Sequence, residues 1–160
     1  MNESKTNQRQ SVLRSALRIS VLLLIILGVL YPLALVGLGQ VVFPYQSNGS
    51  VLLLNGKPVG SSLIAQQLDS PMFFHPRAPY ESGSGVDPDI TPMMAYLQAP
   101  GVSIATGIPL LSLNSLITQQ VDKNEADNLY VFAPPYVNVL ELNIALITSY
   151  PSVYANFTVR

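Results

Sequence analysis

The sequence predicts an α+β protein in which one N-terminal transmembrane helix precedes a small extracytoplasmic domain with a small β-sheet and several short helices. Three observations predict this arrangement. A run of twenty residues, 19–38, carries no charge, four basic residues precede that run, and short apolar runs separated by Pro and Gly follow it. Only 11% of the 160 residues are charged, less than half the usual quarter of a soluble domain.

The apolar run is long enough to cross a membrane. At about 1.5 Å per residue, a twenty-residue helix spans roughly the 30 Å of a bilayer's hydrocarbon core. A cleaved signal peptide has a shorter apolar region and a small-residue cleavage site, and residues 36–40 offer no such site. A buried core helix would be shorter and amphipathic. We therefore expect a transmembrane helix over residues 19–39, kinked at Pro32 and stopped by Pro44.

The distribution of charge predicts the orientation of this helix. Lys5, Arg9, Arg14 and Arg18 precede the apolar run, and Lys57 is the only basic residue close behind it. The positive-inside rule then makes residues 1–18 a cytoplasmic tail, polar and frayed over residues 1–15, and residues 45–160 an extracytoplasmic domain. We expect a single-pass protein of the cell membrane with a cytoplasmic N-terminus. The exported part has eight acidic and four basic residues, which argues against nucleic-acid binding.

Local signals predict the elements of the exported domain. Asn55-Gly56 favours a hairpin over residues 50–59, and Ser61 or Ser62 is suited to cap a short helix that runs to Leu68. Five prolines indicate loop over residues 71–92. Thr91-Pro92 then opens a helix through Leu97, followed by a helix over 109–120, strands over 129–132 and 136–140, and a helix over 141–148. The chain has no cysteine, so the stability of this domain must come from its core.

The transmembrane segment contains few small residues. Gly28, Ala34 and Gly37 are small positions in an otherwise bulky helix, and close helix packing in lipid relies on such positions. We expect the face that bears Gly37 and the kink at Pro32 to dock against a partner helix, with Gly28 as a further interface residue.

No set of residues indicates catalysis. His75 is the single histidine and there is no thiol, so a zinc site or a histidine-based triad is hard to assemble. The loop with Ser82, Gly83, Gly85, Asp87 and Pro88 superficially resembles a calcium or phosphate loop but lacks the required carboxylate spacing and lysine. We interpret this loop as a turn closed by aspartate side chains.

Two other groups of polar residues are interpreted as structural. His75 and Arg77 belong to a pinned loop, in which Arg77 pairs with Asp87 or Glu81. Near the second strand, Asn138, Glu141 and Asn143 are expected to cap backbone groups. We predict no catalytic, cofactor-binding or metal-binding residue.

Several motifs, in a characteristic order, resemble the family of the C subunit of the Kdp potassium-transporting P-type ATPase, KdpC. They are YPLALVGLGQVVFP (31–44), QSNGS (46–50), NGKPVGSSLIAQ (55–66), FFHPR (73–77), SGSGVDPDITP (82–92), GIPLLSLNSLI (107–117) and VNVLELNIAL (137–146). The resemblance implies an accessory subunit of a high-affinity, ATP-driven potassium uptake complex, without a reaction of its own. Its partners would be a channel-like potassium-binding subunit and an ATP-hydrolysing subunit. Assembly, regulation and a catalytic-chaperone role toward the ATP-hydrolysing subunit are implied, with ATP involved only at the level of the complex.

The sequence departs from the family pattern at one place. Members of the family usually carry some tens of residues, including a helix, between the FHPR-like and SGSGxDP motifs, whereas here only residues 78–81 join them. The alternative functions are a membrane-tethered extracytoplasmic binding or adhesion module and a membrane-anchored hydrolase.

Overall fold

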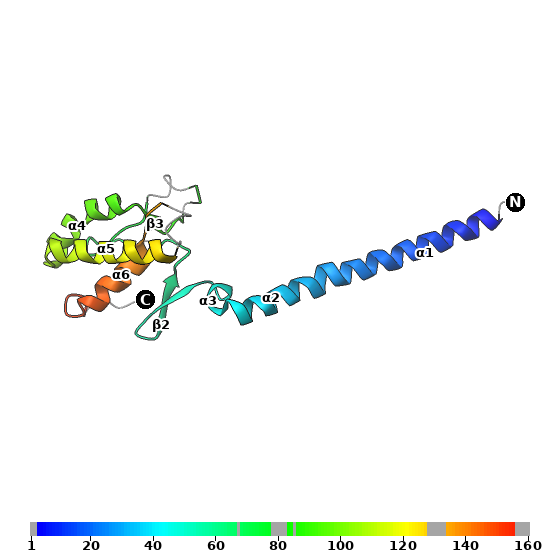
Figure 1. Ribbon diagram of the computed structural model, residues 1–160, viewed down its shortest axis with the longest axis horizontal. Coiled ribbons are helices and arrows are strands. Elements are labelled where there is room, and N and C mark those ends of the chain that lie inside the picture. The colour runs from blue at the N-terminus through cyan, green and yellow to red at the C-terminus, as the bar shows by residue number, and fades with distance from the viewer. Residues whose placement is uncertain (1–2, 67, 78–82, 85, 128–133, 156–160) are drawn as a thin grey trace. The chain divides into compact units, whose positions relative to one another are not determined.

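The computed structural model describes residues 3–66, 68–77, 83–84, 86–127 and 134–155. The chain divides into two compact units, Met1–Asn48 and Gly49–Arg160. The order of the elements along the chain can be followed in Figure 1.

The first unit is almost entirely helical. α1 (Glu3–Ile25), the π-helix η1 (Ile26–Leu30) and α2 (Tyr31–Val42) follow one another without a break, and the single turn α3 (Pro44–Ser47) comes after Phe43. The expectation that residues 1–15 are frayed is therefore wrong for the described residues, because α1 begins at Glu3. Phe43 leaves the helical conformation (φ −132°, ψ 61°), as expected for the residue before a proline.

The π-helical turn η1 ends directly before Tyr31 and Pro32, the site of the predicted kink. The Tyr31 N–H donates to the Ile26 carbonyl, five residues earlier, and Pro32 has no N–H to donate. A π-turn directly before a proline changes the hydrogen-bond register where the α-helical ladder would lose a donor.

One helix among the described residues is long and apolar enough to cross a membrane. It runs over Val12–Val42, with a mean hydropathy of 2.8 in its most apolar window. This segment is longer than the predicted one because it includes Arg14 and Arg18, whose long side chains can extend toward the lipid headgroups.

The second unit opens with a β-hairpin. β1 (Val51–Leu54) pairs antiparallel with β2 (Lys57–Ser61), with an irregular register between Leu52 and Leu53. Asn55 (φ 52°) and Gly56 (φ 77°) form the predicted turn. The helix predicted after Ser61 is wrong. The Ser61 hydroxyl instead donates to the Gly49 carbonyl (2.6 Å) and accepts from the Leu63 N–H (3.1 Å), which closes a turn.

A second, shorter pair of strands joins distant parts of this unit. β3 (Asp89–Ile90) pairs antiparallel with β4 (Val137–Asn138), so that Asp89 faces Asn138 and Ile90 faces Val137. The loop predicted over 71–92 thus contains a strand. The strand predicted over 136–140 is shorter than expected, because α6 (Val139–Ser149) begins at once. The strand predicted over 129–132 lies outside the described residues.

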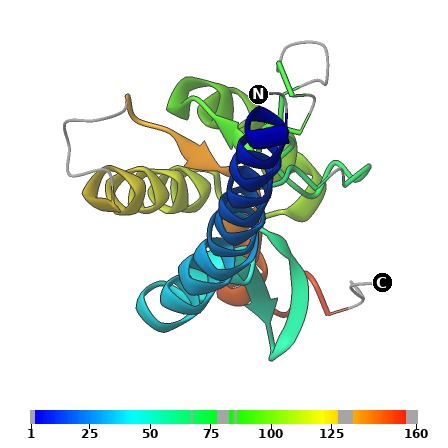
Figure 2. The ribbon, with the colours of Figure 1, turned by 90° about the vertical axis from the view of Figure 1, so that its right-hand side faces the viewer.

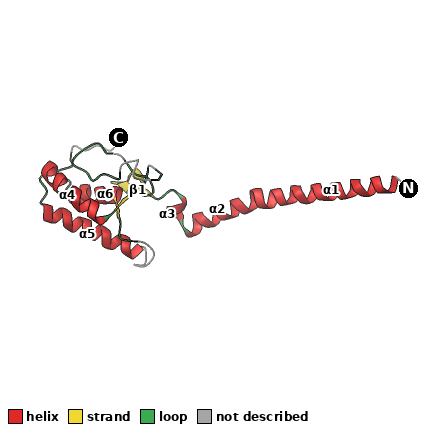
Figure 3. Ribbon diagram, turned by 90° about the horizontal axis from the view of Figure 1, so that it is seen from above, coloured by secondary structure: helices red, strands yellow, loops and turns green. Residues whose placement is uncertain are grey.

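Both predicted central helices are present and longer than expected. α4 (Pro92–Thr106) is capped by Thr91, whose hydroxyl accepts from the Met94 N–H (3.3 Å), and it continues past Pro100 until Gly107 takes a left-handed conformation. α5 is Leu110–Asp127. Helices make up most of the second unit and the strands are short (Figure 3).

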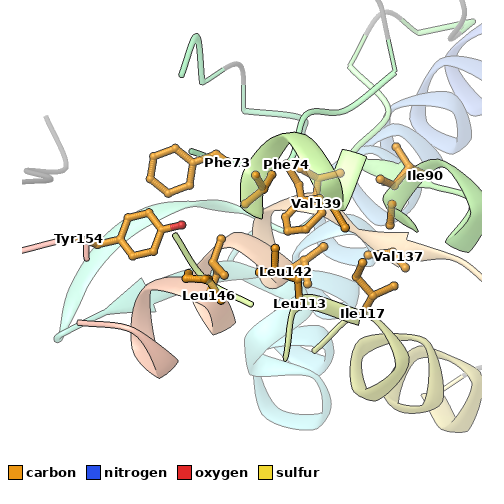
Figure 4. Close-up of a cluster of buried hydrophobic side chains, with 14 residues drawn as sticks. Phe73, Phe74, Ile90, Leu113, Ile117, Val137, Val139, Leu142, Leu146 and Tyr154 are labelled. Atoms are coloured by element: carbon orange, nitrogen blue, oxygen red, sulfur yellow. The ribbon is translucent and has the colours of Figure 1, made fainter. Parts of the chain in front are cut away.

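The core of the second unit lies between the three long helices and the aromatic motif that precedes β3. Phe73 and Phe74 are each 1% exposed, and the Phe73 ring lies 5.2 Å from the ring of Tyr154. Figure 4 shows this pair beside the side chains of α5 and α6. The largest other buried residues are Ile90, Leu113, Ile117, Val137, Leu142 and Leu146.

Candidate functional site: a polar scaffold around the FFHPR and VDPD segments

Two amide side chains hold the FFHPR segment to the helices. Asn143, on α6, accepts from the Phe74 N–H and donates to the Phe74 carbonyl, both at 2.9 Å. Gln98, on α4, accepts from the His75 N–H at 2.8 Å and donates to the His75 carbonyl at 3.0 Å. Each amide therefore pairs with a backbone unit as a neighbouring β-strand would, and consecutive residues are fixed to two different helices.

These contacts revise the interpretation of Asn143 and add Gln98 to the site. Asn143 was expected to cap backbone groups near the strand–helix junction, yet the backbone unit with which it pairs is that of Phe74, 69 residues away in sequence. Gln98 could not be identified from the sequence, because a glutamine at a half-buried position of a helix carries no local signal of its partner. His75 lies in the pinned loop that was predicted, and its backbone makes the contacts to Gln98.

The predicted ion pair of Arg77 is made with Asp87. Arg77 Nη2 lies 3.0 Å from Asp87 Oδ2, with both side chains about one-third exposed (35% and 30%). The Arg77 Nε–H also donates to the Asp89 carbonyl (3.3 Å), and Asp87 Oδ1 accepts from the Asp89 N–H (3.0 Å). The hydrogen bond from the Asp89 N–H to Asp87 is the aspartate-closed turn expected from the sequence. Both oxygens of the Asp87 carboxylate therefore hold the loop, one through Arg77 and the other through the Asp89 N–H.

The glycine-rich part of this loop is only partly described. Gly83 lies in an exposed turn, and a Cβ placed on it would meet nothing within 4 Å. Ser82, Gly85 and the alternative partner Glu81 lie outside the described residues. Pro88 is buried, and its carbonyl accepts from the Val139 N–H (3.0 Å).

Asp89 and Asn138 form the polar centre of the short sheet. Asn138 Nδ2 donates to Asp89 Oδ1 (2.9 Å) and to the Ser62 carbonyl (2.8 Å). Its Oδ1 accepts from the Glu141 N–H (3.2 Å), which confirms Asn138 as the cap of α6. One side chain thereby joins the hairpin, the short sheet and the C-terminal helix.

Burial raises the pKa of Asp89 above its ordinary value. The hydrogen bond from Asn138 and the charge of Arg77 oppose this increase, while the charges of Asp87 and Glu141 add to it. Desolvation is the largest of these effects, because the carboxylate loses water when the two strands pair.

Glu141 connects α6 to α5 and does not act as a cap. Its Oε2 accepts from Lys123 Nζ (2.8 Å) and from Gln120 Nε2 (2.6 Å). Asn124, one turn further along α5, donates to the Tyr136 carbonyl (3.2 Å). In the described part of the chain, no buried side-chain nitrogen or oxygen lacks a hydrogen-bond partner. The polar residues therefore hold backbone segments together.

Pro32 and Gly37 lie on different sides of the apolar helix. α2 is a regular α-helix from Tyr31 to Val42, so at 100° per residue Pro32 and Gly37 lie about 140° apart around its axis. Pro32 and Gly37 therefore do not share one face, whereas the sequence interpretation had placed them on the same face. Ala34 and Gly37 are three residues apart, which places them on the same face of the helix. Within the described residues, a Cβ on Gly28 or on Gly37 would meet nothing within 4 Å.

The known proteins to which this chain is similar belong to one family. The model of the family KdpC, "K+-transporting ATPase, c chain", matches residues 13–80 and 78–148. The chain is 35% identical to the potassium-transporting ATPase KdpC subunit of Caulobacter vibrioides, over 88% of this chain and 95% of that protein. The proteins of the same name from Acidobacterium capsulatum and Caldanaerobacter subterraneus are 32% and 29% identical. These two matches cover 84% of this chain and 96% and 94% of the relatives.

The same comparisons locate a deletion. The alignment with the Caldanaerobacter protein extends over 185 residues, although it includes only 84% of this chain of 160 residues. A substantial part of that relative therefore has no counterpart here. The family match divides at residues 78–80, directly after FFHPR. The chain is thus shorter than this relative, and the missing part falls between the FFHPR (73–77) and SGSGVDP (82–88) motifs.

Proposed function

The chain belongs to the KdpC family of K+-transporting ATPase subunits, and we propose that it acts as the assembly and regulatory subunit of a high-affinity potassium uptake complex. In this proposal it has no catalytic reaction of its own. Its partners are a channel-like potassium-binding subunit and an ATP-hydrolysing subunit, which the apolar helix contacts within the membrane and the second unit contacts outside the cytoplasm.

The observation that carries the proposal is the extent of the family match. The match begins at residue 13, continues through the apolar helix and the pinned FFHPR segment, and ends at residue 148 within α6. Both units of the chain are therefore parts of the family's architecture. The polar scaffold supports a structural role, because its side chains are used to fix backbone segments of the second unit to one another.

Co-purification tests this proposal directly. The full chain with an affinity tag is co-expressed with the other subunits encoded by the same organism, and the recovered complex is analysed for both partners. We expect both partners to be recovered together and potassium uptake at low external potassium to depend on the chain. Recovery of the chain alone, with normal uptake in its absence, would favour the membrane-tethered binding module.

The orientation of the chain is part of the proposal. Four basic residues precede the most apolar stretch and one follows closely, so residues 1–18 are cytoplasmic and residues 45–160 extracytoplasmic. Protease added to intact spheroplasts should digest the second unit and leave an N-terminal tag protected. Digestion of the tag, with protection of the second unit, would reverse the orientation.

The catalytic-chaperone role requires a specific mechanism. ATP is cytoplasmic, and on the proposed orientation only the segment 1–18 of this chain reaches that side. We therefore propose that any influence on nucleotide affinity passes through the transmembrane helix to the ATP-hydrolysing subunit. Nucleotide affinity of the complex should be the same with the full chain and with a chain that begins at Val12. A large loss with the shorter chain would instead indicate direct contact between the N-terminal segment and the nucleotide site.

A further inference from the structure

The β1–β2 hairpin and the residues just beyond it expose several large apolar side chains. Leu53 is 60% exposed and Val51 40%, and just beyond β2 Leu63 and Ile64 are 62% and 48% exposed. Isolated hairpins are marginally stable in water, so an exposed apolar strand in one is a liability unless something covers it.

The base of the hairpin is held firmly. The Ser62 N–H donates to the Ser50 carbonyl (3.0 Å), and the Ser62 carbonyl accepts from Asn138 Nδ2 (2.8 Å). At Gly60 the backbone approaches Leu140 so closely that an added Cβ would lie 3.0 Å from its Cδ2. The base of the hairpin is thus fixed to the rest of the second unit. Its strands lie apart from α4 and α5 in Figures 1 and 2.

The charge distribution around the hairpin is one-sided. Between Arg18 and Asp69 the only charged residue is Lys57, at the first position of β2, and every acidic residue of the second unit comes at Asp69 or later. Lys57 is exposed. Lys57 pairs with Leu54 beside the turn, on the face opposite Leu53. The hairpin segment itself has apolar side chains, one cation and no carboxylate, a composition that complements an anionic lipid surface, because acidic side chains would be repelled there.

The chain also limits how far the hairpin can lie from the end of the apolar helix. Val51 follows Val42 by nine residues, four of which form the helical turn α3. Even a fully extended chain of nine residues reaches only about 30 Å, and a helical turn shortens this reach further. If Val12–Val42 crosses a membrane, β1 must begin within this distance of the membrane surface.

From these four observations we infer that the β1–β2 hairpin is a second membrane contact, in which Leu53 and Leu63 enter the lipid–water interface and Lys57 binds anionic headgroups. This inference rests on the proposal that the apolar helix crosses the membrane. A second contact restricts the rotation of the exported unit about its tether. It would thereby present the unit to partners in a limited range of orientations, which lowers the entropic cost of assembly.

Lipid-borne quenching of single-cysteine variants tests the inference. The chain has no cysteine, so a fluorescent label can be attached at one position in the full chain. Labels are placed at L53C and L63C, at V36C within the apolar helix, and at L111C. Leu111 is the matched control because it is an apolar residue of the same unit that is 83% exposed. The chain alone is reconstituted in nanodiscs of phosphatidylcholine and phosphatidylglycerol, with and without brominated lipid.

We expect strong quenching at V36C, clear quenching at L53C and L63C, and only background quenching at L111C. In the K57Q variant, the ratio of lipid-contacting to free L53C label should fall by about fivefold in anionic nanodiscs, since one basic side chain near an anionic surface contributes about that factor. Far-UV circular dichroism of each labelled variant confirms that it is folded.

Three outcomes would overturn the inference. If V36C is quenched and L53C and L63C are not, the helix is inserted and the hairpin lies in water. If the L53C label is not quenched by lipid in the chain alone, and becomes shielded from water only in nanodiscs that also contain the other subunits, the hairpin binds a protein. If V36C itself is not quenched, the membrane anchoring on which the inference rests is wrong.

Discussion

Asn143 and Phe74 exchange two hydrogen bonds of 2.9 Å although 69 residues separate them in sequence. Asn143 is 2% exposed and Phe74 is 1% exposed, so water cannot replace either bond. This pair attaches the FFHPR segment to α6 in the centre of the core, and the stability of the second unit should depend on it more than on any surface ion pair.

Replacing Asn143 with alanine should destabilise the second unit strongly. The Phe74 N–H and carbonyl would both be left buried without partners, at a cost of about 1–3 kcal/mol each. We expect the free energy of unfolding to fall by about 2–6 kcal/mol, measured by thermal unfolding of the full chain in detergent with near-UV circular dichroism. Gln119→Ala is the matched control, because the Gln119 amide is exposed and contacts Ser115 in its own helix. Equal effects of the two substitutions would contradict the role of the pair.

Substitutions of Asp87 should separate its turn contact from its ion pair. Asp87→Asn keeps an oxygen that can accept from the Asp89 N–H and loses only the charge. Because the Arg77–Asp87 pair is about one-third exposed, Asp87→Asn should lower the free energy of unfolding by about 0–1 kcal/mol. Asp87→Ala loses both contacts and should cost about 1–2 kcal/mol more. Asp122→Ala, at an exposed position of α5, is the control. If both variants unfold like the wild type but transport falls, the loop is a contact site for a partner.

The pH dependence of stability should reveal Asp89. Its pKa is raised in the fold, mainly by burial, so between the ordinary value of 3.8 and the raised value the folded state binds more protons than the unfolded state. Stability is therefore lost as the pH rises through this window. Asp89→Asn keeps an acceptor for Asn138 without the charge. Its unfolding temperature should exceed that of the wild type at pH 7, and the difference should shrink below pH 4. A difference independent of pH would contradict burial of the charge as the cause.

Features that depend on neighbouring residues could be predicted from the sequence. The turn at Asn55-Gly56 and the helix start at Thr91-Pro92 follow from the backbone preferences of two adjacent residues. An ion pair of Arg77 with one of two nearby carboxylates, Asp87 or Glu81, was also predictable, because only a short loop separates the opposite charges. The family motifs supplied the order of these elements, which local preferences alone do not provide.

Features that depend on tertiary packing could not be predicted in the same way. Pro100 suggests the end of a helix, yet α4 continues to Thr106 because Ala95, Ala99 and Val102 on one face are buried in the core. The contacts of Gln98 and Asn143 join residues 23 and 69 positions apart, a separation at which neither residue type nor spacing indicates a partner. The two-residue strand β3 is likewise defined only by its partner β4.

The last prediction concerns the apolar helix as an interface. Ala34 and Gly37 share one face of α2, and leucine at Gly37 would hold a partner helix away from that face. Gly37→Leu should therefore reduce recovery of the complex in co-purification, with unchanged insertion of the chain into membranes. Leu35→Phe is the matched control, since it also adds bulk but lies about 160° from Gly37 around the helix. Equal recovery with both variants would show that the Gly37 face is not a contact and would assign attachment to the second unit or to another face of the helix.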